Sequence, residues 1–100
     1  MSSPRKLPKY KDRLLMDRDY IDSKIQEENL NQIEKWGVQA LSAFEWLAFL
    51  TEEVGELAKA ISEEEYRVGS KLHVSKEAIQ VATLALKIAE MFEFSEKEKP

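Results

Sequence analysis

The sequence predicts an all-α fold, a helical bundle with three main helices per chain that oligomerisation completes. Apolar residues recur at steps of three and four along three segments, as on one face of a helix. Helix-breaking dipeptides at 36–37 and 69–70 separate these segments, and no alternating strand pattern occurs. A chain of 100 residues has room for one core, and a small core gains from burial against a partner.

The first helix is expected from Asp17 or Asp19 to Lys35. Aspartate is a good N-cap residue, and Trp36-Gly37 ends the pattern because glycine usually follows the last residue of a helix. The expected apolar positions are Ile21, Ile25, Leu30 and Ile33.

The second helix is expected over residues 43–65. Ser42 is a suitable N-cap, and Glu45 follows at the spacing of a capping box. This segment has the clearest amphipathic stripe in the chain, which predicts one buried face. The stripe consists of Ala43, Trp46, Leu47, Leu50, Val54, Leu57 and Ile61.

The third helix is expected over residues 75–93 with Ser75 as its cap, or from Leu72 onward. It is apolar almost all round, which indicates burial on more than one side. At about 100° per residue, Glu77 lies within the inner stripe and Gln80 on its flank. The expected inner stripe is Val74, Val81, Ala85, Ile88 and Phe92.

The chain divides into a basic arm with two prolines over residues 1–16, a helical domain over 17–94 and a frayed, charged tail over 95–100. The net charge is −4, yet residues 1–18 carry six of the 15 basic side chains. An acidic body argues against a nucleic-acid partner, which requires a basic face. The arm is interpreted as a solvated tail or a strap that packs on a partner, with phosphate contact as the alternative.

Cysteine is absent, so thiol chemistry and a disulfide framework are excluded. No apolar run approaches the roughly 20 residues that span a bilayer, and the N-terminus has no apolar signal core. We therefore expect a cytoplasmic protein without a membrane partner.

Two polar pairs carry the functional prediction: Glu53 with Glu56, and Glu77 with Gln80. Residues three apart are neighbours on a helix surface, so two antiparallel helices would aim all four at one point. Carboxylates gathered in an apolar setting require a cation or protons. Oxygen ligands favour Mg²⁺, with Mn²⁺ as a possible substitute.

Two alternatives involve no metal. The first pair alone fits a solvated helix shoulder, and Glu77 could form a buried ion pair with Lys59 or Arg67.

These residues occur within a wider pattern that resembles the MazG-like all-α nucleoside triphosphate pyrophosphohydrolases. The pattern comprises Gln32-x-x-x-Trp36-Gly37, then Glu52-Glu53-x-x-Glu56, then Glu77-x-x-Gln80. The family hallmark is Glu-Glu-x-x-Glu followed by Glu-x-x-Asp, so the first part matches in full and the second differs at Gln80. The resemblance covers about residues 20–92.

The resemblance implies metal-dependent cleavage of a nucleoside triphosphate between its α- and β-phosphates, giving the monophosphate and pyrophosphate. It implies metal ligation by Glu53, Glu56 and Glu77, with Gln80 in the fourth place. Glu52 would support a ligand or orient the attacking water, and with Glu53 it makes up the expected catalytic pair. It further implies a homodimer or homotetramer that removes unwanted nucleotides.

Three other residues are expected to bind substrate. Trp36 could stack on a base, Gln32 could hydrogen-bond to a base edge, and Lys59 could meet a phosphate. Trp46 is interpreted as core, although it too could stack on a base. Asn29 suits an exposed helix turn, although it could also hydrogen-bond to a base edge.

Two non-enzymatic alternatives are kept. One is a catalytically weak or inactive relative that binds nucleotide or dimerises. Gln80 favours it, because this residue stands where the family has an aspartate ligand. The other is a partner-binding adaptor whose acidic pairs are salt-bridged.

Overall fold

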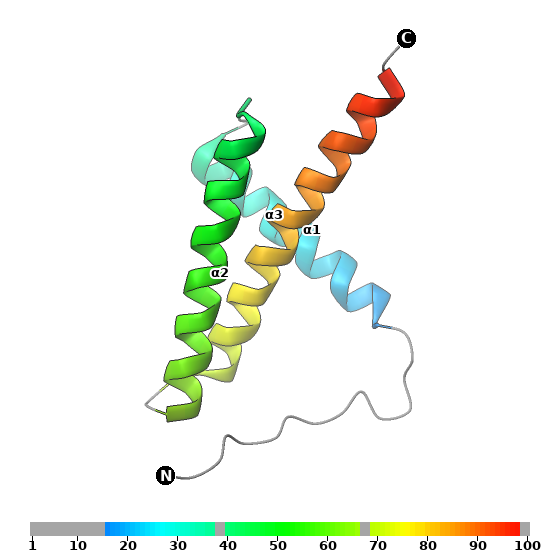
Figure 1. Ribbon diagram of the computed structural model, residues 1–100. Helices are drawn as coiled ribbons and strands as arrows, with labels where there is room; N and C mark the ends of the chain where they lie inside the picture. The colour runs from blue at the N-terminus through cyan, green and yellow to red at the C-terminus, as the bar shows by residue number, and fades with distance from the viewer. Residues whose placement is uncertain (1–15, 38–39, 67–68, 99–100) are drawn as a thin grey trace.

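The computed structural model describes residues 16–37, 40–66 and 69–98, which form three α-helices. They are α1 (Arg18–Trp36), α2 (Ala43–Tyr66) and α3 (Lys71–Glu98). The described residues contain no strand, which confirms the all-α prediction. Figure 1 shows α2 and α3 side by side as an antiparallel hairpin, with α1 crossing them. The expected basic arm lies, up to residue 15, outside the described residues.

Both predicted ends of α1 are confirmed. Asp17 caps the first turn, since its carboxylate accepts a hydrogen bond from the backbone N–H of Tyr20 at 3.0 Å. At the other end Gly37 has a φ of 76°, in the region that favours glycine, and its N–H donates to the carbonyl of Ile33 at 2.7 Å. This positive-φ glycine ends the helix.

The predicted capping box begins α2. The backbone N–H of Glu45 donates to the Ser42 hydroxyl at 3.2 Å, and the backbone N–H of Ser42 donates to the Glu45 carboxylate at 3.0 Å. Two N–H groups that would otherwise lack partners are satisfied reciprocally. The helix therefore starts where the sequence predicts.

The third helix begins one residue before the alternative start predicted at Leu72, and it extends past its predicted C-terminal end. It begins at Lys71 because Ser70 is the cap, accepting from the backbone N–H of His73 at 3.3 Å. The assignment of Ser75 as the cap is thus wrong. The helix continues to Glu98, past the expected end near residue 93.

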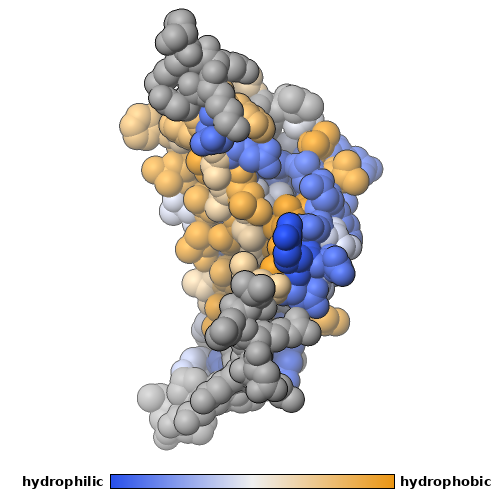
Figure 2. Space-filling view, turned by 90° about the vertical axis from the view of Figure 1, so that its right-hand side faces the viewer, coloured by the Kyte–Doolittle hydropathy of each residue, from blue (hydrophilic) through white to orange (hydrophobic). Residues whose placement is uncertain are grey.

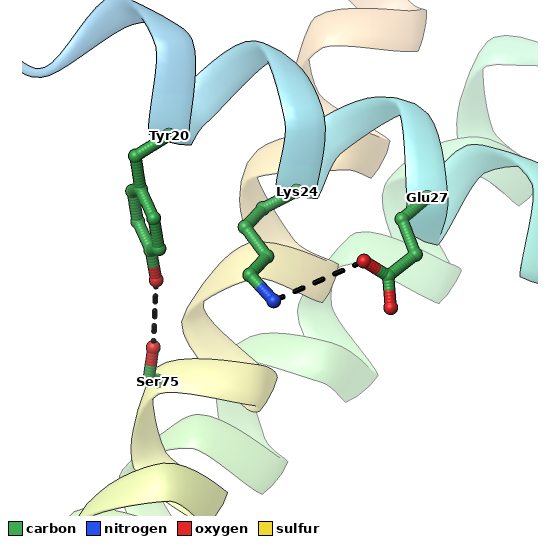
Figure 3. Close-up of polar contacts among 4 residues, drawn as sticks. All are labelled: Tyr20, Lys24, Glu27 and Ser75. Atoms are coloured by element: carbon green, nitrogen blue, oxygen red, sulfur yellow. Dashed lines mark hydrogen bonds and ion pairs between the residues drawn. The ribbon is translucent and has the colours of Figure 1, made fainter.

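Two polar contacts join α1 to α3 at the same sequence separation. The hydroxyls of Tyr20 and Ser75 lie 3.2 Å apart, and the Lys87 ammonium donates to Gln32 Oε1 at 2.8 Å. Each pair is 55 positions apart, so the two helices run in the same sense. Figure 3 shows Tyr20 directed at Ser75 beside an exposed Lys24–Glu27 ion pair within α1, the two charged atoms 3.8 Å apart. Exposed pairs of this kind contribute little stability.

The buried core of the described chain is small. Ala60 of α2 and Leu84 of α3 are its buried apolar residues. Thr83, which precedes Leu84, is also buried, and its hydroxyl donates to the Ile79 carbonyl at 2.8 Å. The expected inner stripe of α3 is wrong at Ala85 and Phe92, which are exposed.

The periodicity also picks the wrong buried face on α1, which packs polar groups against α3. On α1 the buried residues are Glu28 and Gln32, while the apolar Leu30 is exposed. On α3, Glu77 is buried as predicted.

Much of the apolar stripe on α2 is open in the single chain. Leu47 is 53% exposed, Val54 47% and Ile61 45%. Figure 2 shows apolar side chains gathered along one side of the molecule and polar ones along the other. Over the described residues, none of the three helices combines the length and the apolar character required to cross a membrane.

Candidate functional site

The side chains of Glu53 and Glu77 converge on one amide. With its amide turned so that the nitrogen faces the carboxylates, Gln80 donates to Glu53 Oε2 at 2.8 Å and to Glu77 Oε2 at 2.9 Å. The antiparallel packing of α2 on α3 produces this meeting. Three of the four residues of the two predicted pairs are therefore in one place.

Negative charge is concentrated around Glu53. Its pKa is raised, first by burial and then by repulsion from Glu77, Glu56 and Glu28, while Lys35 acts weakly in the opposite sense. A group that resists ionisation in this way is stabilised by a nearby cation. The site therefore favours protons or positive charge.

The environment of Glu77 does not support the ion-pair alternative with Lys59. Glu77 is 9% exposed, and its other carboxylate oxygen lies 4.0 Å from His73 Nε2. Among the described residues no lysine or arginine lies within ion-pair distance of Glu77. Arg67, the second expected partner, lies outside the described residues.

A polar chain across α1 and α3 supports the site from one side. Lys87 donates to Gln32 Oε1 at 2.8 Å, and Gln32 Nε2 donates to Glu28 Oε2 at 2.9 Å. Burial lowers the pKa of Lys87, and the charge of Glu28 opposes that shift. Gln32, only 3% exposed, thus has both ends of its amide satisfied.

Sequence reasoning missed Glu28. The available signal was its position one turn before Gln32, which places both on the same face of α1. It was overlooked because this face is polar, whereas the expected packing face was apolar.

A small polar cavity of about 160 Å³ lies between the Glu53–Gln80 contact and the Glu28–Gln32 contact, and all four residues line it. Acidic and basic side chains share its wall, so a ligand carrying both a cation and anionic groups could be accommodated there. Its lining residues are Glu28, Asn31, Gln32, Lys35, Trp36, Glu53, Lys76 and Gln80.

A larger and mostly apolar cavity of about 320 Å³ adjoins it and shares Gln32 and Trp36 as lining residues. The Trp36 and Phe49 rings are stacked with centroids 6.3 Å apart, and Trp46 meets Phe49 edge-on with centroids at 6.5 Å. All three rings line the larger cavity, which therefore presents aromatic surface.

Three of the remaining predicted site residues do not line the cavities, and two do. Glu52, Glu56 and Lys59 are exposed, and none of them lines either cavity. Glu56 acts on Glu53 through its charge. The predicted substrate contacts Trp36 and Gln32 line both cavities, so their placement is compatible with that role.

The oxygen donors suit a hard divalent cation, but they are not assembled around one. Over the described parts of the chain, no group of three or more aspartate, glutamate, histidine or cysteine side chains is arranged to hold a metal ion. Glu53 and Glu77 instead share the Gln80 amide nitrogen. Turning that amide would present its oxygen, a ligand that Mg²⁺ accepts.

Comparison of the chain with known protein families, with curated proteins and with solved structures finds no significant match.

Proposed function

We propose that the chain is a Mg²⁺- or Mn²⁺-dependent nucleoside triphosphate pyrophosphohydrolase that yields the monophosphate and pyrophosphate. The observation that carries the proposal is the meeting of Glu53 and Glu77, from two helices, at the Gln80 amide. The raised pKa of Glu53 supports it, because such a site gains free energy when a cation enters. The resemblance of the motifs to MazG-like enzymes supplies the reaction.

Within this proposal Glu53 and Glu77 hold the ion, Glu56 joins them by rotating inward, and Gln80 turns its oxygen toward the site. A bound divalent ion neutralises phosphate charge and activates water. Glu52, the residue before Glu53, orients the attacking water. Nucleotide-pool clean-up is the role that the reaction fits.

Two lysines on the wall of the small cavity complement the acids. Lys35 and Lys76 line the same space as Glu53 and Gln80. Their ammonium groups are suited to the phosphate oxygens of a metal-bound nucleotide, which keeps net negative charge. Lysine acts at such sites as a mobile point charge. We assign these two residues to phosphate binding in preference to Lys59, which lines neither cavity.

The proposal includes a second copy of the chain. The open stripe on α2, with Leu47, Val54 and Ile61 each about half exposed, is the surface that a partner would cover. Contiguous apolar surface of this kind is typical of a protein interaction site. A homodimer, or a homotetramer built from it, would complete the bundle.

One assay tests the enzymatic proposal. A panel of ribo- and deoxyribonucleoside triphosphates is incubated with Mg²⁺ or Mn²⁺, and pyrophosphate release is measured. We expect release with at least one substrate, at least a hundredfold loss in Glu53→Gln and Glu77→Gln, and no loss in Glu34→Gln, an exposed acid on α1. Equal rates in all four proteins would refute it.

A second candidate is a module that binds nucleotide without hydrolysing it. The Gln80 amide favours it, because two hydrogen bonds to Glu53 and Glu77 partly satisfy the acids without a metal. Calorimetric titration separates the candidates: the module predicts heat with nucleotide alone and none with Mn²⁺.

A further inference from the structure

We propose that the larger cavity is a nucleobase pocket in which Asn29 and Trp46 hydrogen-bond to the edge of the base. This inference rests on the proposed function for the location of the phosphates. It adds two residues that determine specificity, one of them an aromatic residue that the sequence assigns to the core.

Two residues that line this cavity each carry a buried polar atom without a partner. Among the described residues, Asn29 Oδ1 and Trp46 Nε1 are buried side-chain atoms with no hydrogen bond. Both residues line the larger cavity. A buried polar group without a hydrogen-bond partner destabilises the folded chain. A ligand that pairs with both atoms would remove this cost.

The two atoms define the chemistry of the ligand. Asn29 Oδ1 is an acceptor and requires an N–H or O–H donor, whereas the Trp46 indole N–H is a donor and requires an acceptor. The hydrogen-bonding edge of every common nucleobase carries a donor beside an acceptor. The pattern therefore fits a nucleobase, and does not fit a purely apolar ligand.

The walls of the cavity suit a planar heteroaromatic ring. Trp36, Phe49 and Trp46 form aromatic surface on one side, and their rings contact one another in stacked and edge-on geometry. A base stacks favourably on an aromatic side chain, largely regardless of which base it is. A volume of about 320 Å³ lies at the lower end of the range for small-molecule pockets.

The larger cavity adjoins the small acidic cavity, and this arrangement sets the orientation of a bound nucleotide. Gln32 and Trp36 line both cavities, so a base in the larger one places its sugar at this shared wall. The phosphates then reach the small cavity, with Lys35, Lys76 and Glu53. A nucleotide is the ligand class that carries an aromatic ring and phosphates in this order.

Intrinsic fluorescence gives a readout that does not depend on hydrolysis. The chain has two tryptophans, Trp36 and Trp46, and both line the larger cavity. The full chain is titrated with nucleoside 5′-monophosphates and with ribose 5-phosphate, without divalent ions. We expect quenching by at least one monophosphate and none by ribose 5-phosphate.

Variants separate base recognition from folding. Asn29→Leu keeps the side-chain size and removes the acceptor, and we expect it to weaken binding of the preferred monophosphate about tenfold. Its melting temperature should not fall, because the unpaired oxygen is gone. Ser23→Leu, an exposed neutral polar residue of α1 outside both cavities, is the matched control and should bind normally.

A ligand without the exocyclic donor completes the test. Purine riboside 5′-phosphate has ring acceptors on this edge but no N–H donor. Asn29→Leu should leave its affinity unchanged while lowering that of an aminopurine or aminopyrimidine. Trp46→Phe, which keeps an aromatic ring but removes the N–H, should weaken both.

Three results of the binding experiments would overturn the inference: equal quenching by ribose 5-phosphate, equal affinities of Asn29→Leu and Ser23→Leu, or fluorescence that follows protein concentration instead of nucleotide. The last would indicate that a second copy fills the cavity. Pyrophosphate release that Asn29→Leu does not alter for any base would refute base reading while leaving the proposed function intact. Base binding without pyrophosphate release would refute the proposed function while leaving base reading intact.

Discussion

Gln80 Nε2 donates a hydrogen bond to Glu53 Oε2 at 2.8 Å, across the interface of α3 with α2. The amide takes the position at which a cation would neutralise the carboxylates, and it does so with two N–H groups and no charge. The polar centre of this bundle is thus held together by Gln80, the residue at which the sequence departs from the MazG-like motif it resembles.

Replacing Gln80 with aspartate tests this role. Gln80→Asp adds a fourth carboxylate and removes both donated hydrogen bonds, so we expect the metal-free protein to lose about 1–3 kcal/mol of stability at neutral pH. Mn²⁺ should then raise the melting temperature more than it does in the unaltered protein. An aspartate variant that is as stable as the parent and indifferent to Mn²⁺ would contradict the assignment.

The raised pKa of Glu53 predicts a specific pH dependence. Because the folded-state pKa lies above the ordinary glutamate value of 4.5, the folded chain binds the proton more tightly than the unfolded chain. The contribution of Glu53 to stability is therefore present below pH 4.5 and is lost as pH rises through the folded-state pKa. Glu53→Gln should flatten this part of the stability profile, measured by urea unfolding at a series of pH values. A parallel profile in the variant would exclude Glu53 as its source.

The ends of α1, the start of α2 and the all-α fold class could be predicted directly from the sequence, because they depend on local chemistry. Asp17, Ser42 with Glu45, and Gly37 act within one turn, and each performs the predicted role. Ser70 was missed because Ser75 offered the same capping chemistry and the sequence alone does not rank them. Ser75 instead contacts Tyr20 on α1.

The candidate site was predictable only in part, for a related reason. Glu77 stood out because an acid on an apolar stripe requires a partner, and it is buried as expected. Glu28 and Lys87 were missed because their burial depends on how α1 crosses α3, which periodicity does not specify. The same crossing leaves Leu30 in solvent.

The Lys87–Gln32 contact should couple α1 to α3 energetically. The amine is partly buried and its pKa is lowered by that burial, so the hydrogen bond forms in a setting of reduced dielectric. A double-mutant cycle with Lys87→Met and Gln32→Leu should give a coupling of about 1 kcal/mol in urea unfolding. Additive single effects would show that the contact contributes nothing of its own.

The capping box at the start of α2 should contribute measurable stability. Ser42→Ala removes the acceptor for the Glu45 N–H, and loss of an N-cap costs about 1 kcal/mol. For a domain of this size that corresponds to roughly 4–8 °C in melting temperature. Ser62→Ala, an exposed serine within the same helix, is the control and should change little. If the two variants melt together, the cap is not formed in solution.

The open apolar stripe on α2 predicts that a charge placed there will weaken self-association. Val54 is 47% exposed in the single chain, and a lysine at this position would have to lose its hydration in an apolar interface. Val54→Lys should therefore raise the dissociation constant of the homo-oligomer at least tenfold, measured by light scattering over a dilution series. Ser62→Lys adds the same charge at an exposed polar position of α2 and controls for net charge. Because the stripe is unpaired within the chain, Val54→Lys should leave the helical content of the dissociated protein intact, and a parent chain that is monomeric at every concentration would refute the predicted interface.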